Sequence, residues 1–316
     1  NQPANVHVLD DGLTAHFCRY ILTLPLITIA PDKRGAPTWK LSYMNIHSDP
    51  LTIHVIADYG PMHDLAFAEV KQRIRRALGS QRAIVETYAV PAFDTLATGF
   101  VLAQLSRNPL MEGRHIFYVN TAPRRDNLAA RVANAGEALV YAQLESGAEI
   151  VAVNSGYTLS FVADALTCFC RTSIADQGSQ FRSRDLFPAA LAMLTQADQS
   201  LFGSALPVDS IPTLPAAAVA YVDGYGNLKT TLSTLSFSPN KQVTAVTING
   251  VTRPVSVADG IFSVPEGELV LAPGSSGWKT RNGEHVFYEL CQRGGSAAAA
   301  FGGPVHGLPF TLHQAT

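Results

Sequence analysis

The pattern of apolar and polar positions changes twice along the chain. Up to about residue 50 it is weakly periodic, and we interpret residues 1–50 as an N-terminal extension with one strand across 20–29. From Leu51 onward, short β-rich runs alternate with segments whose apolar residues recur at helical spacing. The strands expected here cover 51–57, 83–88, 115–121, 138–144 and 149–153, and the expected helices cover 64–78, 94–106, 158–165 and 185–196.

This alternation predicts an α/β domain over residues 51–205, with a mostly parallel sheet flanked by helices on both faces. Ligands of such sheets bind beyond the carboxyl ends of the strands. Asp58, Asn120 and Asn154 each follow or end an expected strand, so we expect them near a ligand site.

A second change follows the segment 206–215, whose three prolines indicate a linker. Beyond it the chain shows only short β-rich runs, and Asn249-Gly250 between two of them is typical of a tight hairpin. We therefore expect a small all-β, barrel-like domain over 216–303. Residues 304–316 are interpreted as a tail that is poorly packed at its end.

Composition narrows the functional classes. The chain has 316 residues, of which only 15% are charged, and its formal net charge is −2. Neither a basic footprint for nucleic acid nor an apolar run long enough for a membrane span is present in the sequence. The first residues lack the features of a signal peptide, and the four cysteines form neither a disulfide framework nor a zinc pattern, so a cytoplasmic protein without a metal is expected.

Seven short strings carry a resemblance, and they follow one another in a fixed order. They are Ala57–Gly60, Thr87–Pro91 with Phe93 and Asp94, Phe181–Phe187, Asp223–Leu228, Phe262 with Pro265–Gly267, Gly274–Gly277 and Arg293–Ala297. In this order they resemble the S-adenosylmethionine-dependent halogenases (fluorinase and chlorinase) and hydroxide adenosyltransferases. The resemblance covers about residues 51–303 and implies the same two-domain fold. It also implies a homo-oligomer whose site lies between the N-terminal domain of one subunit and the C-terminal domain of its neighbour.

The resemblance assigns roles to individual residues. Asp58 matches the carboxylate that holds the ribose diol, Asn227 matches the residue that reads the adenine edge, and Phe262 matches the residue that stacks on adenine. Phe93 stands where the halogenases carry a Trp near the reacting carbon, and Ser183 matches their halide-contacting Ser. S-adenosylmethionine would then be a substrate, with no tightly bound cofactor.

The chain departs from the family where the hydroxide enzymes activate water with an Asp, an Arg and a His. Ala122 stands at the Asp, Arg182 stands at the His, and the Arg falls near Asn127, with Arg124 or Arg125 reachable only through a gap. Alanine accepts no proton and arginine stays protonated, so neither Ala122 nor Arg182 acts as a base. The first hypothesis is therefore displacement of methionine at the ribose C5′ carbon through in-line positioning and desolvation of an anionic or water nucleophile.

Glu86 motivates a second hypothesis, because it interrupts an expected strand at a position that is usually apolar in the family. A buried carboxylate would suit general acid/base work, whereas the simpler alternatives place Glu86 in solvent or pair it with Arg75 or Arg76. A repurposed family member of secondary metabolism could then catalyse a Pictet–Spengler ring closure between a tryptophan-like amine and an aldehyde. Glu86 would shuttle protons, an arginine would anchor a carboxylate or phosphate, and Tyr88 or Phe93 would stack on the ring.

A third alternative is a non-catalytic ligand-binding relic of the fold. For the enzymatic hypotheses, the candidate catalytic residues are Glu86, Arg182, Ser183 and Arg125. The candidate substrate-binding residues are Asp58, Tyr88, Phe93, Asn154, Asn227, Phe262 and Arg293. Arg184 is instead expected to form a structural ion pair with Asp185, and His54 to be a core histidine.

Overall fold

The computed structural model describes residues 28–31, 37–40, 50–108, 112–121, 132–234, 243–280, 283–303 and 305–314. The chain divides into two compact units, residues 1–47 and residues 48–316. In the first unit, β1 (Thr28–Pro31) pairs antiparallel with β2 (Pro37–Lys40), and most of the strand expected across 20–29 lies outside the described residues. The domain boundaries drawn within the second unit stay predictions.

A seven-stranded sheet organises the first part of the second unit, in the strand order β4-β3-β5-β7-β6-β8-β9. The first four strands in this order run parallel, and the remaining three continue the sheet in antiparallel fashion. The strands are β3 (Leu51–Ala57), β4 (Ala83–Ala89), β5 (Arg114–Asn120), β6 (Leu139–Leu144), β7 (Glu149–Val153), β8 (Leu166–Thr172) and β9 (Phe202–Ala205). The predicted α/β class is confirmed.

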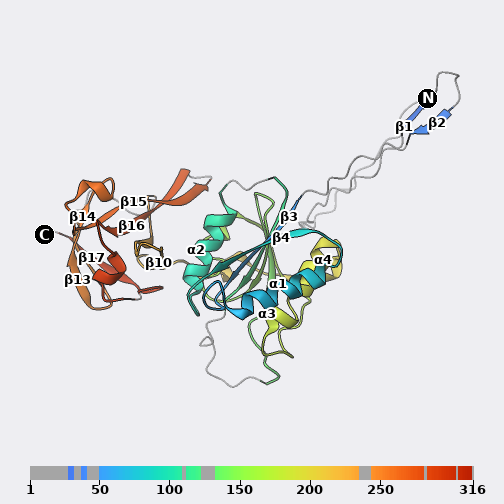
Figure 1. Cartoon of the computed structure of the whole chain (residues 1–316), viewed down its shortest axis with the longest axis horizontal. Helices are drawn as coiled ribbons and strands as arrows, with labels where there is room; N and C mark the ends of the chain where they lie inside the picture. The colour runs from blue at the N-terminus through green and yellow to red at the C-terminus, as the bar shows by residue number, and fades with distance from the viewer. Residues whose placement is uncertain are drawn as a thin grey trace. The chain divides into compact units, whose positions relative to one another are not determined.

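Helices cover both faces of this sheet (Figure 1). On one face lie α1 (Leu65–Leu78), α3 (Arg182–Asp185) and α4 (Pro188–Thr195), and on the other lies α2 (Thr95–Ser106). Asp64 caps α1 by accepting a hydrogen bond from the amide of Ala66, and Asp94 caps α2 through the amide of Ala97, both at 2.9 Å. Each cap therefore fixes the residue at which the loop after a strand ends and the next helix begins.

The periodicity misassigned the segment after β7. A helix was expected over 158–165, but the chain forms turns there, followed by a short 3-10 helix (Ala163–Ala165) and then β8, which the sequence analysis did not predict. The helix expected over 185–196 begins later, as α4 at Pro188, because proline suits the first turn of a helix, and Asp185 is instead the last residue of the short α3.

The C-terminal region contains two small sheets. One has the order β10-β11-β16-β15-β14 and the other β13-β12-β17, and the described strands do not close into one barrel. The strands are β10 (Val219–Val222), β11 (Leu228–Ser233), β12 (Val243–Ile248), β13 (Val251–Pro254), β14 (Ser256–Val257), β15 (Leu269–Thr280), β16 (Gly283–Gln292) and β17 (Phe310–Gln314). The single helix of the described C-terminal residues that is not of the 3-10 type is α5 (Ala297–Ala300). Short 3-10 turns lie at Gln199–Leu201, Val208–Ser210 and Ile261–Ser263.

Two packing features explain the sequence pattern in this part of the chain. The helix α2 is apolar on nearly all sides because it packs on the sheet and also on the C-terminal strands, with Phe100 contacting Tyr221 and Phe287. Within the tail, β17 pairs with β12 and buries Phe310, whereas the side chains at 311, 313 and 314 are exposed. The last two residues of the chain lie outside the described residues, so the expectation of a poorly packed end stays a prediction.

Candidate functional site

A pocket of about 1020 Å³ opens beyond the carboxyl ends of the parallel strands. We call it the strand-end pocket, and its lining comes from the ends of β3 and β5, the loop after β4, residues 134–137 and residues 178–185. Asp58, Phe93, Asn120, Arg182 and Ser183 all line it. Four of the residues that the sequence analysis selected therefore converge here from separate segments, together with Asn120, which was expected near a site.

Asp58 joins this pocket to the loop after β4. Its backbone amide donates to the carbonyl of Asn120 at 3.3 Å, and its Oδ2 accepts from the amide of Phe93 at 2.9 Å. Phe93 has a φ of 65°, a left-handed conformation that is costly for a bulky residue, and 46% of it is exposed. The carboxylate thus holds a strained backbone that presents an aromatic ring to the pocket.

The floor of the pocket is formed by buried hydroxyl groups and aromatic rings. Ser183 is buried, and its carbonyl accepts from the hydroxyl of Tyr118 at 2.6 Å. Tyr59 packs edge-on against Phe67 and Phe181, and burial raises its pKa above the usual range, so the phenol stays neutral. The Tyr59 hydroxyl therefore adds no charge to a pocket whose lining is otherwise rich in polar side chains.

The two arginines of this segment serve different purposes. Arg182 Nη1 donates to the carbonyls of Glu137 and Asp176, at 3.0 and 2.8 Å, and so pins residues 132–137 to the loop before α3. Arg184 pairs with Asp185 at 2.8 Å and with Glu69 at 3.1 Å, which confirms the expected ion pair. The role of Arg182 in holding a nucleophile stays a prediction, and Arg125 lies outside the described residues.

Three predicted residues lie in the C-terminal region and do not line the strand-end pocket. The side chain of Asn227 donates to Asp223 at 3.1 Å, so its orientation is fixed within the turn. Phe262 is 83% exposed, and the guanidinium of Arg293 lies 5.8 Å from its ring centre. Asn154 follows β7 and is exposed, also outside the pocket lining. Completion of the site by a second copy of the chain stays a prediction.

A buried charge network, which the sequence analysis missed, links two of the resembling strings. Lys229 Nζ lies 2.6 Å from Glu289 Oε1, and the amide of Ser275 donates to the same oxygen at 2.9 Å. Asp223 in turn accepts from the amides of Tyr225 and Asn227. The charged residues at positions 229 and 289, each within a strand, were the sequence signal that could have revealed this charge network.

Glu86 does not occupy a buried position. It lies on β4, the edge strand of the sheet, and is exposed, so the desolvation on which the sequence argument relied is absent and the simpler alternative of a solvent-facing carboxylate is confirmed. It is not part of the strand-end pocket. Its neighbours on the same sheet face are Tyr88, His54 and His115, which we call, together with Glu86, the edge-strand cluster.

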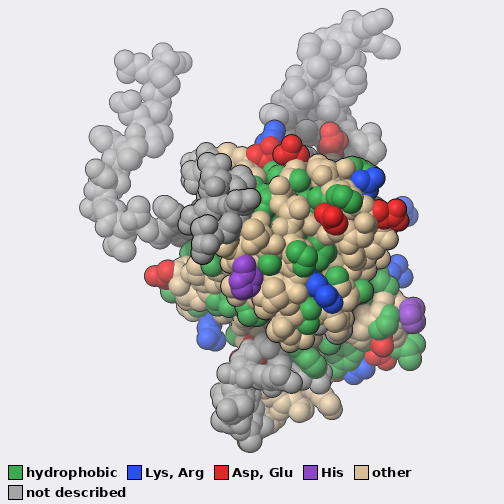
Figure 2. All heavy atoms as spheres, turned by 90° about the vertical axis from the view of Figure 1, so that its left-hand side faces the viewer, with side chains coloured by type: hydrophobic (Ala, Val, Ile, Leu, Met, Phe, Trp, Pro, Cys, Tyr) green, Lys and Arg blue, Asp and Glu red, His purple; other side chains and the backbone are tan. Residues whose placement is uncertain are grey.

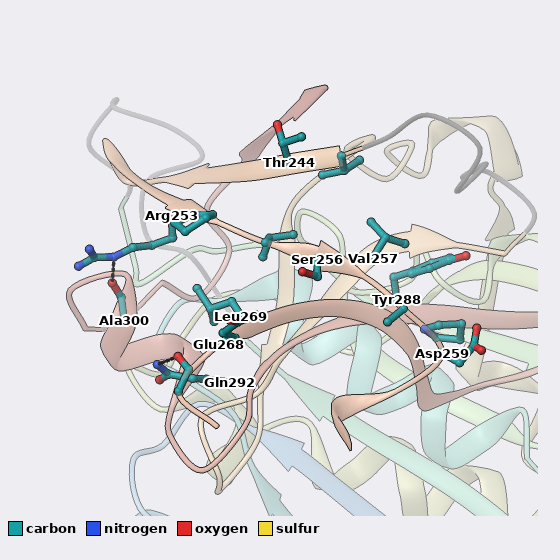
Figure 3. Close-up of a pocket in the computed structure, with 16 residues that line it drawn as sticks. Thr244, Arg253, Ser256, Val257, Asp259, Glu268, Leu269, Tyr288, Gln292 and Ala300 are labelled. Carbon is teal, nitrogen blue, oxygen red and sulfur yellow. Dashed lines mark hydrogen bonds between the residues drawn. The ribbon is translucent and has the colours of Figure 1, made fainter. Parts of the chain in front are cut away.

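Figure 3 shows a larger hollow of about 1130 Å³ in the C-terminal region, lined by residues of β12 and β13 on one side and of β15 and β16 on the other. Arg253 extends away from Tyr288 in this view, toward Ala300, and its Nε donates to the carbonyl of Ala300 at 2.9 Å. None of the residues selected from the sequence lines this hollow. We therefore place the candidate site in the strand-end pocket.

The described residues bear on three further expectations, which concern surface charge, membrane helices and metal ligands. Figure 2 shows the described Lys and Arg side chains scattered singly over the face it displays, interspersed with Asp and Glu. Within the described ranges, no helix has both the length and the apolar character that a membrane crossing needs. The same ranges hold no group of three or more His, Cys, Asp or Glu side chains arranged to hold a metal ion.

Comparison with known proteins supports the fold. No family profile and no curated protein matches this chain. A solved structure described as an uncharacterized conserved protein from Thermotoga maritima is similar, with a TM-score of 0.59 and 19% identity over 82% of this chain and 98% of its own. A conserved hypothetical protein from Thermus thermophilus has a TM-score of 0.56 and 24% identity over 83% of this chain and 100% of its own. At these sequence identities, the two similarities show that this chain has the same fold, and they carry no information about its function.

Proposed function

We propose that the chain binds S-adenosylmethionine and displaces its methionine at the ribose C5′ carbon with an anionic nucleophile. The observation that supports this most is the convergence of Asp58, Phe93 and Ser183 on one pocket, since the resemblance assigns these residues to the ribose, the reacting carbon and the nucleophile. The pocket volume of about 1020 Å³ is at the upper end of the roughly 300–1,000 Å³ of ordinary small-molecule sites.

The chemistry fits a site without a general base. The nucleophile forms a bond to C5′, the C5′–S bond breaks, and its electron pair neutralises the sulfonium as methionine leaves. An anion brings no proton to be removed, so Ser183 would only orient it, and the buried floor would lower its hydration. Asp58 would accept hydrogen bonds from the ribose hydroxyls.

A matched pair of variants tests this function. Wild-type protein incubated with S-adenosylmethionine and sodium chloride should form 5′-chloro-5′-deoxyadenosine, detected by mass spectrometry. Asp58→Asn keeps an acceptor for the Phe93 amide but loses the charge, and should reduce product at least tenfold or so. Asp64→Asn, the same change at the helix cap outside the pocket, should leave it unchanged. The proposal is refuted if the wild-type protein neither binds S-adenosylmethionine nor forms a halogenated product with chloride, bromide or fluoride.

A second candidate function, the acid/base condensation, is favoured by a different observation. Burial, and to a lesser extent the nearby carboxylate of Glu86, raise the pKa of the Tyr88 hydroxyl, which is hydrogen-bonded to the buried His54. Replacing Glu86 by Gln should abolish condensation of tryptamine with an aldehyde while leaving S-adenosylmethionine binding intact. Full retention of the condensation rate in that variant would remove this candidate.

A further inference from the structure

One buried hydroxyl group at the strand-end pocket has a proton to donate and no acceptor for it. Tyr59 lines this pocket, and its hydroxyl oxygen is buried without a hydrogen-bond partner among the described residues. Burying a polar group that makes no hydrogen bond costs about 1–3 kcal/mol, and phenylalanine would fill the same space without that cost. The Tyr59 hydroxyl is therefore a candidate donor to a bound molecule.

Packing fixes the position of this hydroxyl. The Tyr59 ring contacts the rings of Phe67 and Phe181 edge-on, with 5.1 and 5.5 Å between ring centres. The preceding residue is fixed as well, because Asp58 accepts a hydrogen bond from the amide of Phe93. The ring is therefore held in place, and its hydroxyl cannot turn into open solvent unless these contacts break.

A second hydroxyl group, that of Ser183, lies beside the first. Burial raises the pKa of Tyr59, and the nearby Ser183 side chain partly opposes this effect, although no well-oriented hydrogen bond joins the two groups. Ser183 also lines the pocket, is only 3% exposed, and is fixed through its carbonyl, which accepts a hydrogen bond from Tyr118. Two neutral hydroxyl groups from separate segments therefore meet at the pocket, and both can donate to one bound atom.

The charges around the pocket limit what the two hydroxyls can bind. Both arginines of the described lining are paired with carboxylates: Arg182 lies 3.7 Å from Glu137, and Arg184 lies 2.8 Å from Asp185. Asp58 adds a further carboxylate, so the described lining carries no excess of positive charge. The cost of removing an ion from water rises steeply with its charge, and phosphate or sulfate is bound best through unpaired arginine forks. The class of ligand that fits is a monovalent anion of modest hydration, such as chloride or bromide.

We propose that the hydroxyls of Tyr59 and Ser183 donate together to chloride or bromide in the strand-end pocket, with Tyr59 as the second donor of this anion site. The inference deepens the proposed function, and it rests on that function only for the fate of the anion. In the displacement step the anion forms its bond to C5′, methionine leaves with the electron pair of the C5′–S bond, and both hydroxyls keep their protons. The two residues therefore orient the anion and stabilise it, and neither acts as a base.

Chloride binding, measured by ³⁵Cl NMR line broadening on the full chain without S-adenosylmethionine, tests the site. Wild-type protein should broaden the chloride signal, and bromide should remove the broadening by displacement, whereas sulfate at equal ionic strength should not. Tyr59→Phe removes only the hydroxyl and should weaken chloride binding at least about tenfold, the effect of one hydrogen bond to a charged group. Tyr141→Phe removes another buried hydroxyl of the same sheet, outside the pocket, and should bind chloride like the wild type.

Product formation separates this inference from the proposed function. With S-adenosylmethionine present, Tyr59→Phe should raise the KM for chloride at least about tenfold and change kcat less, because it removes binding of the anion. Chloride binding that depends on Tyr59, without any binding of S-adenosylmethionine, would support the anion site and count against the proposed function.

The inference is overturned if folded wild-type protein binds no chloride, or if sulfate displaces chloride as well as bromide does. It is also overturned if Tyr59→Phe, with an unchanged melting temperature, binds chloride like the wild type. Ser183→Ala decides the case if Tyr59→Phe does not fold, because loss of the other donor should weaken chloride binding to a similar extent. Undiminished affinity in that variant contradicts a site with two donors.

Discussion

The strand-end pocket and the edge-strand cluster are built on the same sheet by different means. The pocket is assembled from loops, and its polar groups hold backbone: Asp58 holds the amide of Phe93, and Arg182 holds two carbonyls. The cluster is assembled from strand positions, and its polar groups hold one another across β4, β3 and β5. Substitutions in the pocket should therefore disturb local loop order, whereas substitutions in the cluster should change proton equilibria.

The largest effect expected from this difference is the pH dependence of the cluster. Burial, together with the neighbouring His115, lowers the pKa of His54 from about 6.5 to about 4 in the folded chain, so the unfolded chain binds a proton first as pH falls. The stabilisation is complete above about pH 7 and is lost as pH falls towards 4, by up to about 3 kcal/mol. Urea unfolding at pH 7, 5.5 and 4 should show a steeper loss for wild type than for His54→Phe, and equal slopes would contradict this assignment.

The next effect concerns the loops of the pocket. Arg182→Met leaves the carbonyls of Glu137 and Asp176 without their donor and should cost about 2–3 kcal/mol of unfolding free energy. Hydrogen exchange should quicken in residues 132–137 while the histidine signals of the cluster stay unchanged. Arg184→Met removes more exposed ion pairs and the contact with the Phe181 ring, and should lower the unfolding free energy by less than Arg182→Met does. Similar losses in both variants would show that Arg182 does not pin the pocket.

The smallest effect has the opposite sign. Phe93 is held at a φ of 65°, which glycine adopts without strain, so Phe93→Gly should raise the unfolding free energy by up to about 1 kcal/mol. Removal of the ring should at the same time weaken S-adenosylmethionine binding. Thermal unfolding measures the stability of Phe93→Gly, and calorimetry on the same samples measures its binding of S-adenosylmethionine. A loss of stability would show that the Phe93 ring stabilises the fold by more than its backbone strain costs.

The two sites also differ in how far the sequence reveals them. Asp58 and Ser183 each lie in a short run of consecutive residues that carries the resemblance, so both could be identified from the sequence. In the structure both line the strand-end pocket. The row of Tyr88, His54 and His115 depends on which strands are neighbours and in what register, and a single sequence does not specify the order β4-β3-β5. The interpretation of His54 as a core histidine is confirmed by its burial, but its two ring partners could not be predicted from the sequence.

Whether local sequence pattern and tertiary packing agree also separates the correct from the incorrect parts of the fold prediction. Long periodic segments such as α1 and strands ending in capped loops were predicted, because local pattern and tertiary packing agree there. The segment 158–165 was misassigned because Leu159, Val162 and Ala165 have helical spacing, while burial against Phe100 and the following pairing of β8 with β6 determine its actual form. Tertiary context overrides local periodicity in such short segments.

The central claim is that the strand-end pocket binds the adenosyl group, and isothermal titration calorimetry tests it most directly. Titration of wild-type protein with S-adenosylmethionine, and separately with adenosine, should give saturable binding at micromolar concentrations. The affinity should fall about tenfold in Asp58→Asn and stay unchanged in Glu86→Gln. The absence of binding heat for both ligands at millimolar concentration, in protein that is folded by circular dichroism, would contradict the account.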